Sequence, residues 1–198
     1  MNSRPFFVLT CCLCVVALAI SLYVWQLRKQ SEEETPSTAA PEVVTTPANA
    51  IHKQVTLWVA QDKTGNLQSQ SLSIVTSLER QREAEDILRA LLSVYTAKGS
   101  PHPLATGTGV RNVFFVDPGL VVIDVTAELS DGQTSGIFAE ELTVASLVQT
   151  LASNFPDISR VKFLVDGKEA TTLAGHVDLS NTYDISQFSA LAKQFSAQ

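Results

Sequence analysis

The chain has few of the residues on which covalent chemistry depends. Only 3 of its 198 residues are cysteine, and Cys11, Cys12 and Cys14 all lie in one apolar run near the amino terminus. The rest of the chain can therefore form no internal disulfide and must rely on its own apolar core. Such a domain suits either redox compartment.

Positive charge is also scarce. From Ala50 onward the sequence has 11 Lys and Arg against 16 Asp and Glu, a net charge of −5. No basic stripe with interleaved aromatic residues occurs. This pattern excludes nucleic acid as a partner and disfavours adhesion to anionic lipid headgroups.

Catalytic and metal-binding patterns are missing as well. The 3 histidines, His52, His102 and His176, have no second histidine or cysteine at metal-ligand spacing. His176 lies near Asp178, but we interpret it as a turn histidine bonded locally. Gly107 to Gly109 precedes a hairpin, whereas a Rossmann phosphate loop follows a strand and opens a helix.

Carboxylates give no legible acid–base pair either. Glu140 and Glu141 are adjacent in a predicted helix, so their side chains diverge by about 100° and instead favour the helix dipole. Asp124 is expected on a solvated face or at a strand end, and no nucleophile elbow is present. The sequence predicts no enzyme, no cofactor and no metal.

One long apolar run, Phe6 to Leu27, contains no charged residue. A segment of about 20 residues matches the thickness of a bilayer core. We predict a retained transmembrane anchor over residues 1–30. A signal peptide cleaved after Ala17 to Ala19 is the alternative, while the early cysteines disfavour a lipoprotein. Charge alone does not decide the orientation.

Residues 31–50 are rich in Pro, Thr, Ala and Glu, with Pro36, Pro41 and Pro47 spaced along them. This composition predicts a disordered linker that spans roughly 25 Å. The expected organisation is an anchor at 1–30, a linker at 31–50, a folded domain at 51–184 and an amphipathic tail at 185–198.

The central structural signal is a hairpin. β-branched and aromatic residues from Val113 to Val125 flank Asp117-Pro118-Gly119, a strong turn sequence. Alternation predicts further strands at residues 54–60, 67–75 and 160–166.

Two amphipathic helices frame this hairpin. Thr76 to Glu79 has the spacing of a capping box and predicts the start of the first helix. The second is predicted over Ile137 to Asn154. The order ββαββαβ indicates an α+β domain with a mixed sheet and two helices on one face, with Ser130 to Gly136 as a polar turn.

Several short segments together carry a family resemblance. They are Val55 to Trp58, Leu91-Leu92, Gly107 to Val110, Val121 to Thr126, Ala145 to Leu151, Val161 to Gly167 and Gly175 to Asp178. In this order and spacing they resemble the GerMN domain of sporulation and spore germination proteins. Unlike many members, the chain has a single copy, and Ala105 stands where proline is common.

The resemblance implies a fold similar to ring-building motifs and a domain outside the cytoplasmic membrane, anchored by Phe6 to Leu27. It implies a role in assembling a cell-envelope complex rather than catalysis. The expected partners are envelope proteins, including further copies of the chain.

Trp58, Val122 and Leu164 are the candidate partner contacts. If both helices cover one face of the sheet, these three side chains share the other face, unless the stripe of Ile185, Phe188, Leu191 and Phe195 covers it. The alternative function is binding of peptidoglycan glycan, for which Trp58 would supply a stacking surface. An envelope hydrolase is a third alternative.

Overall fold

The computed structural model describes residues 50–116, 118–132 and 136–186. The predicted anchor, nearly all of the linker and residues 187–198 of the tail lie outside the described residues. Within the described ranges, no helix is both long and apolar enough to span a membrane.

The described chain opens with a long hairpin. Strands β1 (Ala50–Gln61) and β2 (Asn66–Ser77) pair antiparallel over twelve residues each, without a shift in register. Both strands were predicted. The expectation that they join the central sheet is wrong, because they form a two-stranded sheet of their own.

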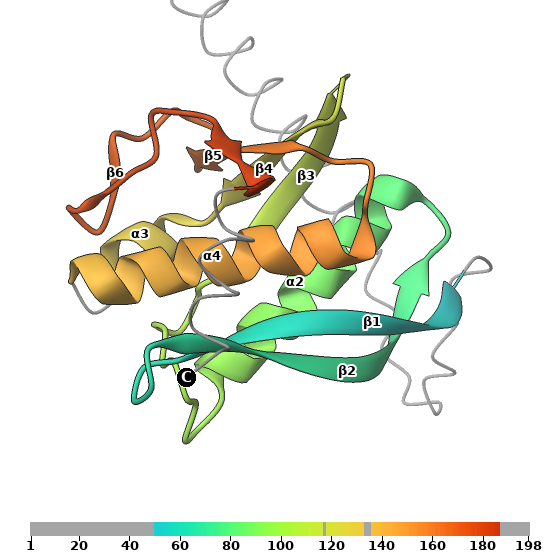
Figure 1. Cartoon of the computed structure of the whole chain (residues 1–198), viewed down its shortest axis with the longest axis horizontal. Coiled ribbons are helices and arrows are strands. Elements are labelled where there is room, and N and C mark those ends of the chain that lie inside the picture. The colour runs from blue at the N-terminus through green and yellow to red at the C-terminus, as the bar shows by residue number, and fades with distance from the viewer. Residues whose placement is uncertain (1–49, 117, 133–135, 187–198) are drawn as a thin grey trace, which may run out of the picture. The chain divides into compact units, whose positions relative to one another are not determined.

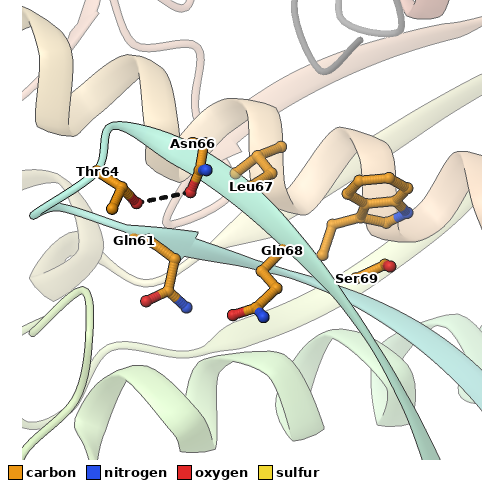
Figure 2. A pocket seen from close by; sticks show the side chains of 7 residues that line it. Gln61, Thr64, Asn66, Leu67, Gln68 and Ser69 are labelled. Carbon is orange, nitrogen blue, oxygen red and sulfur yellow. Dashed lines mark hydrogen bonds between the residues drawn. The ribbon is translucent and has the colours of Figure 1, made fainter. Parts of the chain in front are cut away.

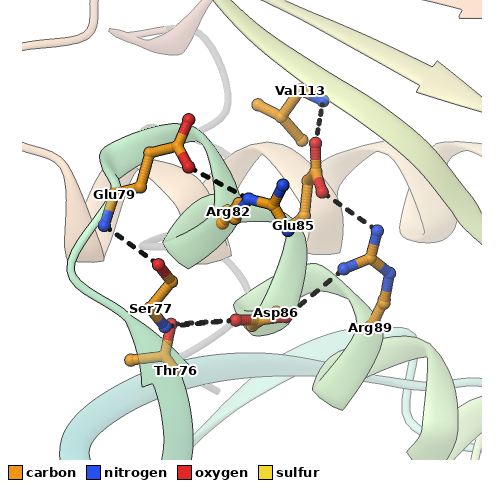
Figure 3. A network of polar contacts seen from close by, with 8 residues as sticks. All are labelled: Thr76, Ser77, Glu79, Arg82, Glu85, Asp86, Arg89 and Val113. Atoms are coloured by element: carbon orange, nitrogen blue, oxygen red, sulfur yellow. Dashed lines mark hydrogen bonds and ion pairs between the residues drawn. The ribbon is translucent and has the colours of Figure 1, made fainter. Parts of the chain in front are cut away.

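Helix α2 (Arg80–Thr96) is amphipathic, as predicted, and its buried face includes Ile87, Leu88 and Leu91. Its predicted capping box does not form, and the residue before the helix makes no side-chain cap. Thr76 and Ser77 instead bond to Asp86 within the helix (Figure 3). These two residues therefore end β2 and tie it to α2.

The predicted central hairpin is confirmed. Strands β3 (Val110–Val116) and β4 (Leu120–Val125) pair antiparallel, and Gly119 in the turn has φ +70°. Strand β5 (Arg160–Val165) pairs parallel with β4, and β8 (Tyr183–Asp184) pairs antiparallel with β5. The result is a mixed four-stranded sheet in the order β3-β4-β5-β8.

Helix α4 (Ile137–Asn154) has the predicted bounds. A short helix α3 (Ala127–Asp131), which the sequence did not indicate, begins before the predicted polar turn at Ser130 and ends within it. Strands β6 (Thr172–Leu173) and β7 (Val177–Asp178) form a small hairpin after β5. The predicted element order is therefore correct for the long elements and incomplete for the short ones.

The helices α2 and α4 lie between the β1–β2 hairpin and the sheet of β3, β4 and β5 (Figure 1). Leu57 from β1 and Ile123 and Phe163 from the sheet are at most 2% exposed and belong to one apolar cluster with both helices. Burial of each such side chain stabilises the fold by about 1.5–3 kcal/mol. Both helices thus lie on one face of the mixed sheet, as expected.

Candidate interaction surface

The face of the sheet that points away from the helices carries a row of apolar side chains. Alternation along β3, β4 and β5 turns every second residue to this side. Val122 lies directly opposite Phe114, and Leu120 lies opposite Val116. We call this set the outer-face patch: Phe114, Val116, Leu120, Val122 and Leu164.

Two members of the outer-face patch are strongly exposed. Phe114 is 41% exposed and Val116 is 44% exposed, whereas Val122 and Leu164 are half-buried. The sequence analysis named Val122 and Leu164 but missed Phe114 and Val116. A hairpin register centred on Pro118 places Phe114 opposite Val122 and Val116 opposite Leu120. The turn sequence could therefore have predicted that Phe114 and Val116 share this face.

Two charged residues lie among the members of the patch: Lys162 is opposite Val122, and Asp124 is opposite Leu164. Asp124 is 4% exposed and accepts a hydrogen bond from the backbone amide of Gly167 at 2.7 Å. It also forms an ion pair with Arg111 at 3.3 Å. Lys162 donates to the carbonyl of Ser180 and lies 3.4 Å from a carboxylate oxygen of Glu169. The charges within the patch are therefore already satisfied, and its uninterrupted apolar part is Phe114, Val116, Leu120 and Val122.

Trp58 does not belong to this face. It lies in β1, and its indole nitrogen donates to the hydroxyl of Ser153 in α4 at 2.7 Å. The prediction that Trp58 shares a face with Val122 and Leu164 is wrong, because β1 pairs with β2 in a separate two-stranded sheet and the helices lie between the two sheets (Figure 1).

Trp58 instead borders a hollow of about 470 Å³ beside the tip of the β1–β2 hairpin. Figure 2 shows the amide side chains of Gln61, Asn66 and Gln68 close to this hollow. The hydroxyl of Thr64 donates to Asn66 at 2.7 Å. The complete lining is Trp58, Gln61, Thr64, Asn66, Leu67, Gln68 and Ser69. An indole surrounded by uncharged hydrogen-bonding groups suits a neutral polar ligand.

A chain of polar contacts joins the exposed Asp62 to the buried His102 and Thr143. The histidine Nδ1 lies 2.5 Å from Asp62, and its Nε2 lies 2.7 Å from the Thr143 hydroxyl. The order Thr143, His102, Asp62 resembles that of a catalytic nucleophile, its base and an orienting acid. However, Thr143 is fully buried and donates to the carbonyl of Ala139 at 3.0 Å. The chain therefore connects the hairpin tip, the loop after α2 and helix α4.

A second polar cluster centres on Glu140, which is fully buried. Its carboxylate accepts the backbone amides of Gly136 at 3.2 Å and of His176 and Val177 at 2.9 Å each. The Nδ1 of His176 lies 2.8 Å away. Burial acts to raise the pKa of Glu140, but these donors outweigh it and hold the pKa below its ordinary value.

Two predictions about this cluster are corrected. His176 was expected to bond locally, yet its partner is 36 residues away in the chain. Glu140 was expected only to favour the helix dipole, yet it fixes the turn between β6 and β7. Asp178 bonds to Ser180 and Asn181 instead. Among the described residues, no group of three or more His, Cys, Asp or Glu is placed to hold a metal ion.

The fold is a mixed α+β domain of the GerMN type. The tandem GerMN domains of the sporulation protein GerM from Bacillus subtilis are 22% identical with a TM-score of 0.55, and the match covers 69% of this chain and 48% of that one. The chain therefore spans about half the length of that relative. The first GerMN domain of the same protein is 21% identical with a TM-score of 0.50, covering 67% of this chain and 97% of that one.

At these identities the solved structures establish the fold alone. Residues 56–171 match the Germane family, described as sporulation and spore germination. This match covers more than half of the chain, which therefore belongs to the Germane family. No curated protein matches the chain.

Proposed function

We propose that this chain is a membrane-anchored interaction module that helps to assemble a sporulation- or germination-type complex of the cell envelope. Residues 6–27 anchor it, residues 31–50 tether it, and the domain lies outside the cytoplasm. Membership of the Germane family supports this assignment. The observation that carries it is the outer-face patch, an apolar row on the sheet face opposite the helices.

A partner that covers this patch would remove Phe114 and Val116 from water at little polar cost, because Asp124 and Lys162 already have partners. Aromatic side chains that fill pockets in a partner supply much of the energy of protein interfaces. Phe114 is the expected anchor, with Val122 beside it and Leu164 one strand further along the sheet.

The test is proximity labelling around the full chain in its own cells, which reports compartment and neighbours together. We expect labelled neighbours outside the cytoplasmic membrane, and we expect Phe114→Ala with Leu164→Ala to lose them. Phe138→Ala is the matched control, since Phe138 is 47% exposed and lies in α4, away from the patch. Neighbours that persist in the double variant would refute the role of the patch.

The tail offers a competing occupant of the patch. If residues 187–198 cover it, their deletion would expose Phe114 and increase capture of partners. If the patch binds a partner directly, deletion would leave capture unchanged. The deletion variant and the full chain should be compared at equal amounts of folded protein.

Binding of cell-wall glycan is the second candidate, because the hollow beside Trp58 combines an indole with amide side chains. Sedimentation with purified cell wall tests it. Trp58→Ala should abolish co-sedimentation, and Trp58→Phe should retain part of it by keeping an aromatic ring. Equal sedimentation of the wild type and Trp58→Ala would exclude this site.

A further inference from the structure

Helix side chains close the second half of the free edge of β1, from Thr56 to Ala60. The edge of a strand presents unpaired amides and carbonyls that invite another strand to pair. In α4, Asn154 donates to the outward carbonyl of Thr56 at 2.8 Å. Three outward amides in the second half of β1 have side-chain acceptors: Thr56 bonds to Asn154 at 3.1 Å, Trp58 to Thr150 at 2.9 Å and Ala60 to Tyr95 at 2.8 Å.

The hydroxyl of Tyr95 is suited to this position. Burial raises its pKa to about 12, so it remains a neutral hydroxyl that can accept the amide of Ala60. The edge of β1 is therefore closed to a further strand from Thr56 to Ala60.

The edges of the four-stranded sheet are also protected. At β3, the amide of Val113 donates to the carboxylate of Glu85 at 3.3 Å, and Arg89 holds that carboxylate at 3.0 Å (Figure 3). At the other side, β8 has only two residues. Short edge strands and inward-turned charges are common protections against pairing with other chains.

The edge of β2 has none of these protections from Gln68 to Ser73, although at its end Ser77 bonds to Asp86. Its residues Asn66–Ser77 contain no charge and no proline, and the pairing with β1 has no bulge. Gln68 to Ser73 are all exposed, and Leu72 is 44% exposed. No strand among the described residues pairs with this edge.

The outward hydrogen-bonding groups of β2 follow from its register. Thr56 and Trp58 turn their amides away from β2, so their cross-strand partners Ser71 and Ser69 turn their own amides and carbonyls outward too. Ser73, two residues further, does the same. A serine therefore occupies each central position of the open edge.

We propose that β2 pairs antiparallel with β2 of a second copy of this chain, about a twofold axis at Ser71. In this register Ser71 lies opposite Ser71 of the second copy, Ser69 opposite Ser73, and Gln70 opposite Leu72. The two hairpins become one four-stranded antiparallel sheet.

A second copy suits this edge because the edge complements itself. The absence of charge means that self-pairing opposes no like charges, and serine lies opposite serine across the centre, a pair that can hydrogen bond. The contact is small, so the dimer is expected to be weak and concentration-dependent. It uses a different sheet from the outer-face patch, so the two contacts can be tested separately.

Disulfide trapping tests the register. In a full-length background with serine at positions 11, 12 and 14, Ser71→Cys should form a covalent dimer under mild oxidation, because directly opposed residues of a hydrogen-bonded pair lie about 5.5 Å apart. Ser69→Cys and Ser73→Cys should each crosslink slowly alone and quickly when mixed. Crosslinking of Ser71→Cys no faster than that of Ser93→Cys, at an exposed helix position, would overturn the proposal.

Sedimentation equilibrium of the full chain tests the energetics. Ser71→Pro removes an outward amide and spares the hairpin, whereas Ser71→Lys places like charges face to face. Each should weaken self-association by about tenfold or more with an unchanged melting temperature. Ser93→Lys is the charge control. A chain that stays monomeric at all concentrations, or a dimer that both Ser71 variants leave intact, would overturn the proposal.

Discussion

The carboxylate of Glu140 accepts hydrogen bonds from the backbone amides of His176 and Val177, each at 2.9 Å. A side chain in the first turn of α4 thereby fixes a turn that comes 36 residues later. The same carboxylate accepts the amide of Gly136 at the start of its own helix. One buried charge thus orders two segments.

Glu140→Gln should destabilise the domain by about 2 kcal/mol at neutral pH, because a charged acceptor of several hydrogen bonds becomes neutral. The pKa of Glu140 in the folded chain is lowered from the ordinary value of 4.5. Its stabilisation is therefore complete above about pH 4.5 and is lost as pH falls through the lower folded value.

Urea denaturation between pH 3 and 7 measures this effect. The wild type should lose stability below about pH 4.5 more steeply than Glu140→Gln. Glu141→Gln, at the exposed neighbouring position, should change stability by less than about 0.5 kcal/mol. Identical acid slopes for the wild type and Glu140→Gln would contradict the assignment.

Asn154→Ala should cost about 2 kcal/mol, since it leaves both the amide and the carbonyl of Thr56 without their partner. Hydrogen exchange at Thr56 should accelerate in the same variant. Ser153→Ala removes only the bond to the indole of Trp58 and should cost less than about 1 kcal/mol. Unchanged exchange at Thr56 would show that Asn154 does not close the edge of β1.

Glu85→Ala should open the edge of β3. The amide of Val113 would lose its acceptor, at a cost of about 1–3 kcal/mol, and the exposed edge should promote aggregation. Thermal denaturation with light scattering reports both effects. Glu85→Gln keeps an acceptor oxygen and should aggregate less, so equal scattering by the two variants would argue against this role.

Gly65 occupies the tip of the β1–β2 hairpin with φ +68°, and a Cβ at this position would lie 2.6 Å from the ring of Phe138. Gly65→Ala should therefore cost about 1–2 kcal/mol for the left-handed backbone, plus the displacement of Phe138. In a Phe138→Ala background the cost should fall without vanishing. A double-mutant cycle measures the difference, and a zero coupling would mean that Phe138 moves freely.

The elements with strong local signals could be predicted. The turn at Pro118 and Gly119 sets the β3–β4 hairpin, and apolar spacing sets α4 from Ile137 to Asn154. The sheet to which a strand belongs could not be predicted in the same way. Alternation in β1 indicates that it is a strand, but it does not indicate which strand lies beside it. The separation of Trp58 from Val122 depends on that missing information.

Polar contacts between distant segments were predicted least well. Thr76 has the spacing of a capping residue, but its hydroxyl donates instead to Asp86, ten residues away. In the sequence, Glu140 is an ordinary acidic residue at a helix start. It becomes a buried acceptor because the β6–β7 turn packs against it and donates two backbone amides. The burial of His102 depends on Asp62 and Thr143, each about 40 residues away in the sequence.

The closure of β1 also has a consequence for biosynthesis. Thr56 and Asn154 are 98 residues apart, so the hairpin leaves the ribosome long before the side chain that covers its edge has been made. During this interval both of its edges are open to other nascent chains. Pulse-labelled hydrogen exchange on stalled chains that end before and after residue 154 would register the closure as protection of the Thr56 amide.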